Sequence, residues 1–326
     1  MRRKRAADTP HSRRVDATLV VASALAVEPK DSGFDSFSDE RSLLATTILV
    51  AGASVAAAEV TLSGSARMGI SDDGFAAGVV DTDGVDGAKF NSRARVAFSM
   101  SGETDTGLSF GASFRADNAG GANDGTAGSV FISGAFGKIT MGDNDGAAQQ
   151  SVGQVDGVGY TGNGDLNEIA YITGADDESV MYSYTMDAIT INASVGQTGA
   201  SDERGVGVAY AGDGFGLSLG YEEDSVDGSH VVVGASASFS SITVKAVYGS
   251  FSPLGGGANQ NQYAVSATYS ADALSATVFT RSSLADVQAS GVGIGYDLGG
   301  GAAFAAGYSK AENADGRFDA GVTFSF

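Results

Sequence analysis

The sequence predicts an all-β protein, a 16-stranded antiparallel transmembrane β-barrel. Three observations predict this fold class. Hydrophobic and polar residues alternate along many short segments, which is the period of a strand with two different faces. Tight turns alternate with longer connections between these segments, as they do in barrels that cross a membrane. The final segment, "RFDAGVTFSF" from Arg317 to Phe326, keeps the alternation up to a terminal aromatic residue, although chain ends are usually frayed.

The first 58 residues are predicted to lie outside the barrel. "RSLLATTILVAGASVAAAEV" (41–60) has one basic residue, an apolar run and an "AAA" motif, the pattern of a secretory signal peptide cleaved after Ala58. A transmembrane anchor is the alternative, but the run is short and diluted by Thr, Ser and Gly. The Arg-rich segment before it is either an upstream extension from a start site assigned too early or a long n-region. The barrel domain is therefore assigned to residues 59–326.

Composition excludes several classes of protein. Residues 59–326 carry 11 Lys and Arg against 32 Asp and Glu, and the chain has no Cys. Such an acidic domain is a poor partner for nucleic acid, and disulfides and Cys-bound metals are excluded. There are 48 Gly, but a hydrophobic content of 43% and a mean hydropathy of +0.02 argue against disorder. The acidic charge indicates either a solvated surface or a lining for cations and polar solutes.

Sixteen strands account for the alternating segments. They begin near Glu59, Phe90, Gly107, Ala127, Gly137, Val180, Ala188, Arg204, Phe215, Ser229, Ile242, Asn261, Ala273, Gln288, Gly301 and Arg317. Every second connection is a tight turn, and the longest connection runs from Asp143 to Ser179. An even strand number with short turns at one end and longer loops at the other is the plan of outer-membrane barrels.

The strands must close on themselves if they cross a membrane, because hydrocarbon cannot satisfy the backbone groups of an open edge. The last strand is therefore expected to pair with the first, with Glu59 and Phe326 at the same rim. One face of each strand would then contact outer-membrane lipid and the other the lumen. Aromatic residues near strand ends suit the two interfacial girdles: Tyr182, Tyr184, Tyr221, Tyr263, Tyr269, Tyr296 and Tyr308.

Basic residues follow the polar face of the early strands. The alternation places Arg67, Arg93, Arg95 and Arg115 on this face in the first three strands, and Lys138 on that of the fifth. Since a charge facing lipid at mid-membrane costs about 2–4 kcal/mol, these side chains are expected to point into the lumen. They either shape the electrostatics of a pore or simply pair with neighbouring carboxylates.

Several segments of the chain resemble a known family. "EVTLSGSARMG", "NSRARVAFSMSGETDTGLSFGASFRA", "VFISGAFGKITMGD", "YDLGGGA" and the terminal Phe are similar to general diffusion porins of the purple-bacterial (alphaproteobacterial) type. The resemblance covers essentially all of residues 59–326. It implies an outer-membrane homotrimer whose barrels are water-filled channels for ions and small hydrophilic solutes. It also implies that the long third loop folds into the barrel and that its acidic residues face basic side chains on the opposite wall.

Carried over to this sequence, the third loop spans Asp143 to Ser179. Its acidic residues, the implied acidic side of the constriction, are Asp143, Asp145, Asp156, Asp165, Glu168, Asp176, Asp177 and Glu178. Opposed charges across a narrow opening favour oriented polar solutes over apolar ones, and the excess of acid predicts a modest preference for cations. No cofactor is required. Calcium is associated with the acidic loop in this family. Two acidic segments are candidates, one with Asp81 and Asp83 and the other with Asp143 and Asp145. Each is either a calcium loop or a plain turn, and neither has the full EF-hand spacing.

Two other classes of function were compared with passive diffusion. An outer-membrane enzyme such as a lipase needs a nucleophile–base pair, and His230, expected at the barrel rim, is the only imidazole in residues 59–326. A secreted calcium-dependent adhesin or β-solenoid would show a short fixed repeat, and the sequence has none. The sequence therefore favours a channel without enzymatic activity.

Overall fold

The computed structural model describes residues 47–48, 58–74, 87–118, 128–173, 178–196, 202–312 and 314–326. All of them belong to one compact unit, Ser32–Phe326. Their elements in chain order are β1 (Thr47–Ile48), β2 (Glu59–Asp72), β3 (Lys89–Glu103), β4 (Ser109–Asp117), β5 (Gly128–Gly134), β6 (Gly137–Asp143), α1 (Ala147–Val152), β7 (Glu178–Met186), β8 (Ile189–Gly196), β9 (Arg204–Ala211), β10 (Phe215–Asp224), β11 (Gly228–Phe239), β12 (Ile242–Pro253), β13 (Gln260–Ala271), β14 (Leu274–Ser282), β15 (Gln288–Gly299), β16 (Ala302–Ala311) and β17 (Arg317–Ser325). In the part of the chain that is described, no helix is long and apolar enough to cross a membrane.

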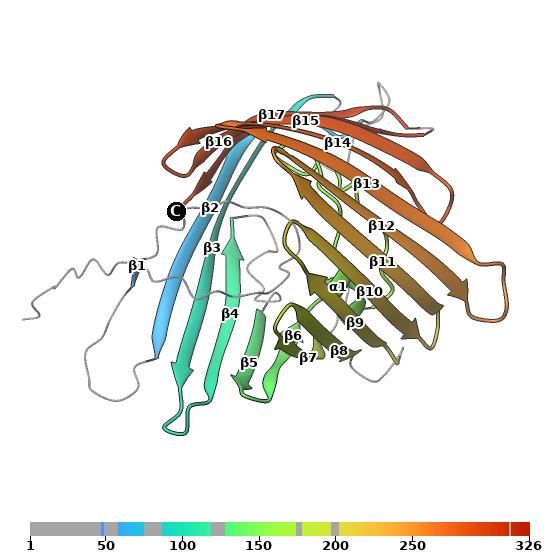
Figure 1. The fold of residues 1–326 in the computed structure, drawn as a ribbon. Coiled ribbons are helices and arrows are strands. Elements are labelled where there is room, and N and C mark those ends of the chain that lie inside the picture. The colour runs from blue at the N-terminus through green and yellow to red at the C-terminus, as the bar shows by residue number, and fades with distance from the viewer. Residues whose placement is uncertain are drawn as a thin grey trace, which may run out of the picture. The chain divides into compact units, whose positions relative to one another are not determined.

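Sixteen of these strands form a closed antiparallel barrel (Figure 1). Each strand from β2 to β16 pairs with the next one in sequence, and β17 pairs with β2. The prediction of a 16-stranded barrel is confirmed, and each predicted strand start lies within two residues of the observed one. Antiparallel neighbours joined by tight turns are the local pairings that alternation and turn residues specify, which explains this agreement.

The barrel closes between β17 and β2. Their register runs from Phe318 opposite Asp72 to Ser325 opposite Ser65. Beyond it the Phe326 amide donates to the Gly64 carbonyl at 2.8 Å, and the Gly64 amide donates to the Phe326 carbonyl at 3.1 Å. The terminal residue therefore belongs to the ladder and cannot fray freely.

Glu59 is the first residue of β2 and precedes the closing contact at Gly64. It pairs with Ser101 of β3, and the terminal Phe meets Gly64 instead. The short strand β1 pairs with Thr61 and Leu62 on the same edge of β2, next to the end of β17. Phe326 is thus part of the closure, whereas Glu59 is not its partner.

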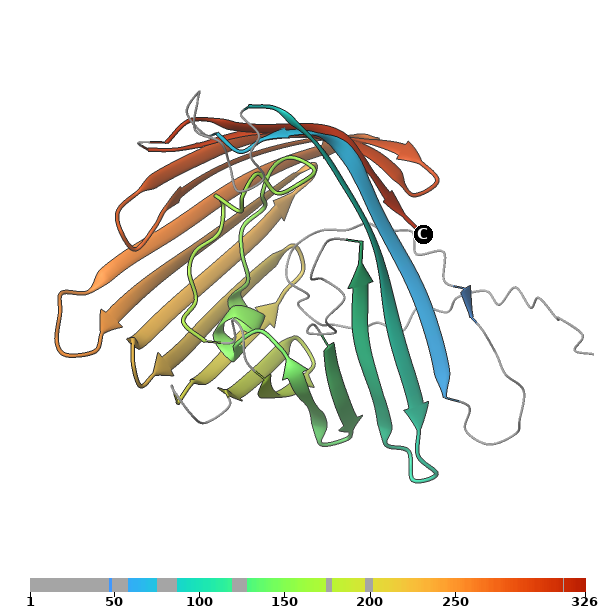
Figure 2. The same ribbon diagram turned by 180° about the vertical axis from the view of Figure 1, so that it is seen from behind.

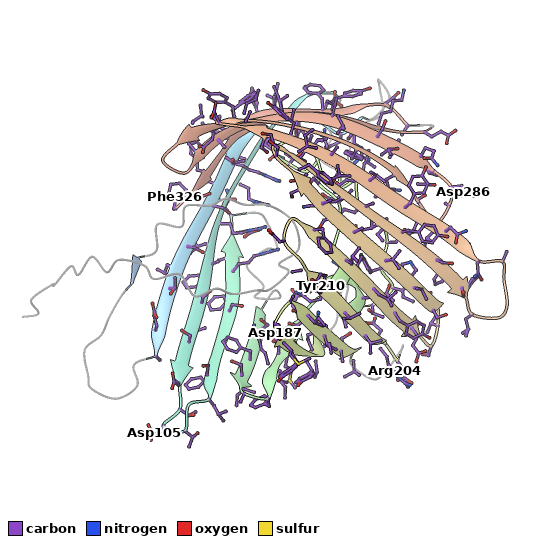
Figure 3. All side chains as sticks on the ribbon, viewed as in Figure 1. Asp105, Asp187, Arg204, Tyr210, Asp286 and Phe326 are labelled. Carbon is purple, nitrogen blue, oxygen red and sulfur yellow. The ribbon has the colours of Figure 1, made fainter. Side chains whose placement is uncertain are left out.

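The barrel places hydrophobic side chains outside and polar ones inside, the reverse of a soluble protein. Leu217 and Val292 on outward positions are 53% and 51% exposed, whereas Glu222, His230 and Gln262 are almost completely buried. This arrangement is stable when lipid surrounds the barrel, because hydrocarbon is the solvent of the outer face. Figure 3 shows side chains projecting all round the barrel, with Arg204 and Tyr210 at opposite ends of β9.

Exposed tyrosines lie near both ends of the strands. Tyr269 and Tyr296 are exposed and close to tight turns, and Tyr221, Tyr263 and Tyr308 are exposed within three residues of the opposite strand ends. This distribution is that of the predicted interfacial girdles, since a tyrosine ring is apolar while its hydroxyl prefers water.

The connection between β6 and β7 lies inside the barrel (Figure 2). Its residues 144–173 are described, and we call them the third loop. The loop begins with helix α1, which packs against β8, β9, β10 and β11. Further along, loop residues Val152, Val155 and Ile169 form a buried hydrophobic cluster with inward-facing Val232, Val247 and Ala264 of the barrel. The prediction that the loop folds inward is confirmed.

Glycines on the inner wall make room for the loop. Gly207 and Gly220 are cross-strand partners on β9 and β10 beneath α1. A Cβ at Gly207 would lie 2.6 Å from the Ala147 carbonyl oxygen, and one at Gly220 would lie 2.8 Å from the Ala148 Cα. Side chains at these positions would therefore prevent the close approach of helix and sheet, and part of the high Gly content is explained.

Candidate functional site: the third loop and the basic wall

Polar side chains of the barrel hold the third loop along its whole described length. Near its start, the Ala147 amide donates to Ser194 Oγ of β8 at 2.8 Å, and Asn192 Nδ2 donates to Ser151 Oγ at 2.9 Å. Further on, Lys245 Nζ of β12 donates to Asp156 Oδ1 at 2.5 Å, and Thr268 Oγ1 of β13 donates to Asp156 Oδ2 at 3.0 Å. Asp156, predicted to line the constriction, therefore attaches the loop to the wall.

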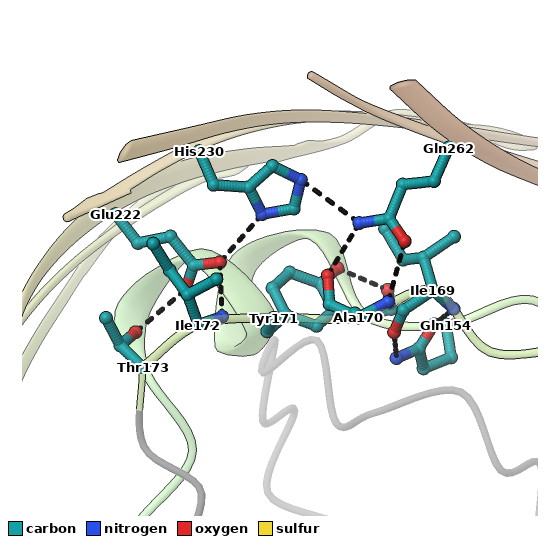
Figure 4. Close-up of polar contacts among 10 residues, drawn as sticks. Gln154, Ile169, Ala170, Tyr171, Ile172, Thr173, Glu222, His230 and Gln262 are labelled. Carbon is teal, nitrogen blue, oxygen red and sulfur yellow. Dashed lines mark hydrogen bonds and ion pairs between the residues drawn. The ribbon is translucent and has the colours of Figure 1, made fainter. Parts of the chain in front are cut away.

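A buried network attaches the later part of the loop (Figure 4). Glu222 Oε1 accepts from the Ile172 amide at 2.9 Å and from His230 Nδ1 at 2.8 Å, and Glu222 Oε2 accepts from Thr173 Oγ1 at 2.8 Å. Gln262 bonds both backbone groups of Ala170, at 2.8 and 2.7 Å, and its Nε2 lies 3.1 Å from His230 Nε2.

These bonds fix the tautomer of His230. Because the Gln262 amide nitrogen can only donate, His230 Nε2 must accept, and the ring proton lies on Nδ1 and is donated to Glu222. His230 has no exposed surface. The expectation that it lies at the barrel rim is therefore wrong: it bridges two residues that hold the loop.

The tip of the loop is attached at the closing strands. Asp319 of β17 accepts from the Tyr160 amide at 3.2 Å, the Thr161 amide at 2.7 Å and the Thr161 hydroxyl. Arg281 Nε of β14 donates to the Leu166 carbonyl at 3.1 Å. The loop therefore follows the inner face from β8 to β17 and reaches β2, where Arg67 contacts Tyr160.

Four predicted basic residues gather on the inner face of β2, β3 and β4, and we call them the basic wall: Arg67, Arg93, Arg95 and Arg115. Arg67 lies directly opposite Arg93 in the ladder, and Arg95 is one inward position further along β3. Arg95 forms a bidentate pair with Asp117, with Nε at 2.7 Å and Nη2 at 2.8 Å from the two carboxylate oxygens. Like charges on neighbouring positions are costly, so their concentration here indicates a water-filled surface.

Lys138 lies apart from the basic wall. It is next to the tight turn between β5 and β6, and its Nζ lies 4.6 Å from the centroid of the Phe131 ring. The structure thus brings the four arginines together but not the lysine.

The predicted acidic residues of the loop have different positions. Asp143 ends β6 opposite Glu178 of β7, whose side chain is not among the described ones. Asp145 accepts from Gln149 Nε2 at 3.0 Å, and burial together with Asp143 raises its pKa. Asp176 and Asp177 lie outside the described residues.

Two acids in the second half of the loop remain in the lumen without a hydrogen-bonded partner for their carboxyl groups in the described structure: Asp165 and Glu168. Burial raises the pKa of Asp165, while Arg67 and Arg317 lower it. Burial, followed by Asp165 and Asp145, raises the pKa of Glu168 to about 7, and Arg281 opposes this shift. Both side chains still contact solvent, so they can contribute charge to the water in the barrel.

The predicted calcium segments are only partly described. Asp81 and Asp83 lie outside the described residues. Within the described part, no three His, Cys, Asp or Glu side chains gather closely enough to hold a metal ion. Calcium at Asp81, Asp83, Asp143 or Asp145 stays a prediction.

The attaching residues were not identified from the sequence. Alternation places Glu222 and Asp319 on inward positions, but it does not show that they meet the loop.

The pattern G-x-S-x-G of hydrolase nucleophiles occurs at 107–111 and 216–220. Its serines, Ser109 and Ser218, lie in β4 and β10, and neither segment forms the strand-to-helix turn that exposes such a nucleophile.

Comparisons with known proteins agree with this architecture. A family profile described as Gram-negative porin matches residues 45–316. The porin of Rhodobacter capsulatus is 50% identical over 97 residues, which are 30% of this chain and 29% of that protein. A porin structure refined to high resolution superimposes with a TM-score of 0.69 at 33% identity and covers 82% of this chain and all of its own. A substituted form of Rh. blastica porin, 19% identical, has the same fold, with a TM-score of 0.67 over 82% of this chain and all of its own.

Proposed function

The chain belongs to the Gram-negative porin family, and from this premise we propose that it forms a channel in the outer membrane for passive diffusion. Ions and small hydrophilic solutes would cross the barrel down their gradients, without a chemical step. Selection by size and charge would occur where the third loop narrows the lumen opposite the basic wall.

One observation carries this proposal: the described loop is attached to only part of the barrel. It bonds to inward side chains of β7, β8, β10, β12, β13, β14, β16 and β17, and to Arg67 of β2 beside the closing seam. No hydrogen bond joins its described residues to β4 or β5, or to Arg93 and Arg95 of β3. A passage bounded by the loop on one side and the basic wall on the other is the arrangement that this attachment supports.

Such a passage would select by charge and polarity. Asp165 and Glu168 would contribute negative charge from the loop, and the basic wall positive charge from β2–β4. The field across a narrow aqueous gap orients dipolar solutes and penalises apolar ones, which cannot replace the water they displace. The acidic excess of the barrel domain supports a modest preference for cations.

Charge selection can be tested by reversal potentials across a planar bilayer in a salt gradient. Arg93→Gln should raise the preference for cations, because it removes a lumen charge that has no ion pair among the described residues. Arg95→Gln should also raise it, because the loss of this arginine leaves the negative charge of Asp117 unpaired. Arg204→Gln is the matched control, since Arg204 is 63% exposed beside Glu223. Equal shifts in all three variants, or none, would show that the basic wall does not border the passage.

We extend the proposal to assembly and export. Three copies would form the channel unit, and the signal peptide would be removed after Ala58. Discrete conductance steps in groups of three, a trimer mass in detergent and a mature N-terminus at Glu59 are the expected results. A monomer with single steps, or a different N-terminus, would contradict the corresponding part.

A further inference from the structure

A second feature of the lumen lies between the third loop and the connection from β14 to β15. There the structure contains a cavity of about 370 Å³, lined by Glu168–Ala170, Gln262, Arg281 and Ser283–Ala285. Its volume is near the lower end of the range for small-molecule sites, about 300–1,000 Å³. Asp286, labelled in Figure 3, marks this connection, which lies at the end of the strands opposite the tight turns.

The cavity carries one acidic and one basic side chain. Glu168 and Arg281 influence each other electrostatically, but no direct ion pair joins them in the described structure. An acid and a base that share a cavity without meeting leave each charge partly unsatisfied. A ligand with a single charge would attract one of these groups and repel the other.

The surroundings hold these two groups in place. Arg281 Nε donates to the Leu166 carbonyl, which leaves its terminal nitrogens for another partner. Both backbone groups of Ala170 are bonded to Gln262, so the loop edge of the cavity is rigid. A site with fixed polar groups binds more tightly, because less freedom is lost on binding.

The remaining lining suits a ligand with a small apolar part. Ser283 Oγ accepts from the Val287 amide at 3.2 Å, so its own hydroxyl hydrogen can be donated to a ligand. Leu284 and Ala285 provide apolar surface beside it.

We propose that this cavity binds small zwitterionic solutes of the α-amino acid class. Glu168 would accept the ammonium group, Arg281 and the Ser283 hydroxyl would donate to the carboxylate, and Leu284 and Ala285 would contact an aliphatic side chain. The inference rests on the proposed channel function, which brings solutes into the lumen. The site would concentrate amino acids beside the passage before they cross it.

The test uses three ligands with the same aliphatic tail and the protein purified from outer membranes. Leucine has both charges, 3-methylbutylamine only the positive one and 4-methylpentanoate only the negative one. Titration calorimetry at pH 7 should show leucine binding at least about 10-fold more tightly than either analogue, as expected for a second charge-assisted contact. Equal affinities would mean that only the tail is recognised and would overturn the proposal.

Glu168→Gln is the decisive variant, because the Glu168 carboxyl makes no hydrogen bond in the described structure and its loss leaves the loop attached. It should weaken leucine binding about 10-fold or more and make 4-methylpentanoate the better ligand, since Arg281 then lacks a competing acid. Asp286→Asn, in the same connection but outside the cavity lining, should leave both affinities unchanged. If Glu168→Gln leaves the ligand order unchanged, or if Asp286→Asn changes it equally, the site is refuted.

Single-channel currents separate this inference from the function on which it rests. Normal conductance without selective leucine binding would refute only the amino acid site. A folded barrel that passes no current would refute the proposed channel.

Discussion

Replacing Glu222 by Ala should release the later part of the third loop while the barrel stays closed. Glu222 has no exposed surface and accepts three hydrogen bonds, from Ile172, Thr173 and His230. Two of the three donors belong to the loop. The ladder of β10 with β9 and β11 uses backbone groups only, so it does not depend on this carboxylate.

The magnitude follows from the three bonds. A hydrogen bond to a charged group contributes about 1.5–3 kcal/mol, but the sum overstates the loss because water can enter the space left by the side chain. We therefore expect local detachment of the loop to become easier by about 3 kcal/mol, roughly a 100-fold larger detached population. Glu222→Gln should have a smaller effect, about 10-fold, because the Thr173 hydroxyl can reverse its role and accept from the new amide.

Chymotrypsin cleavage of the folded protein measures this population, since Tyr160 and Tyr171 lie in the loop. Cleavage after Tyr171, followed by mass spectrometry, should accelerate in the order wild type, Glu222→Gln, Glu222→Ala. Glu223→Gln is the matched control, because Glu223 is the next residue of β10 and its carboxylate contacts exposed Arg204 and Tyr221. If Glu222→Ala is cleaved no faster than Glu223→Gln, the buried network does not hold the loop.

Three further predictions follow from the same geometry. Cation preference should increase as pH rises through about 7, where Glu168 loses its proton. Reversal potentials of the Glu168→Gln variant should not show this increase. If they do, the increase belongs to another titrating group. Gly220→Val should displace α1, because even its Cβ would lie 2.8 Å from Ala148, and should lower the free energy of unfolding by about 1–3 kcal/mol. Gly295→Ala, whose Cβ would approach mainly the Ser275 hydroxyl, should lower it less in denaturant melts. Equal losses of stability in the two variants would contradict the close-approach argument. Deleting Phe326 should lower the temperature at which the barrel unfolds in detergent, because two closing hydrogen bonds with Gly64 are lost, and an unchanged midpoint would show that the seam is held elsewhere.

The barrel could be predicted from the sequence because its information is local. Alternation along each strand defines two faces, and tight turns such as those at Asp187 and Ser240, both at positive φ, set the pairing of consecutive strands. The inward direction of Arg93 and Asp319 followed from the same alternation. Hydrocarbon outside the barrel then requires closure, which assigned the last strand to the first without any long-range signal.

The attachment of the third loop could not be predicted because its contacts join distant parts of the chain. Asp156 meets Lys245 and Thr268, about 90 and 110 residues later, and nothing in either segment specifies the other. His230 illustrates the same difficulty. Its position near a strand start indicated the rim, whereas Glu222 beside it and Gln262 two strands away enclose it completely.

These attachments also change how the acidic composition relates to selectivity. Asp156 is paired with Lys245, and Glu222 and Asp319 are hydrogen-bonded and buried beneath the loop, so solutes in the lumen do not meet these carboxylates directly. The charge that solutes meet in the described lumen therefore depends on a few groups, chiefly Asp165 and Glu168 on the loop against the basic wall. Because Glu168 titrates near pH 7, selectivity should respond to single substitutions and to pH far more than the net charge of the domain indicates.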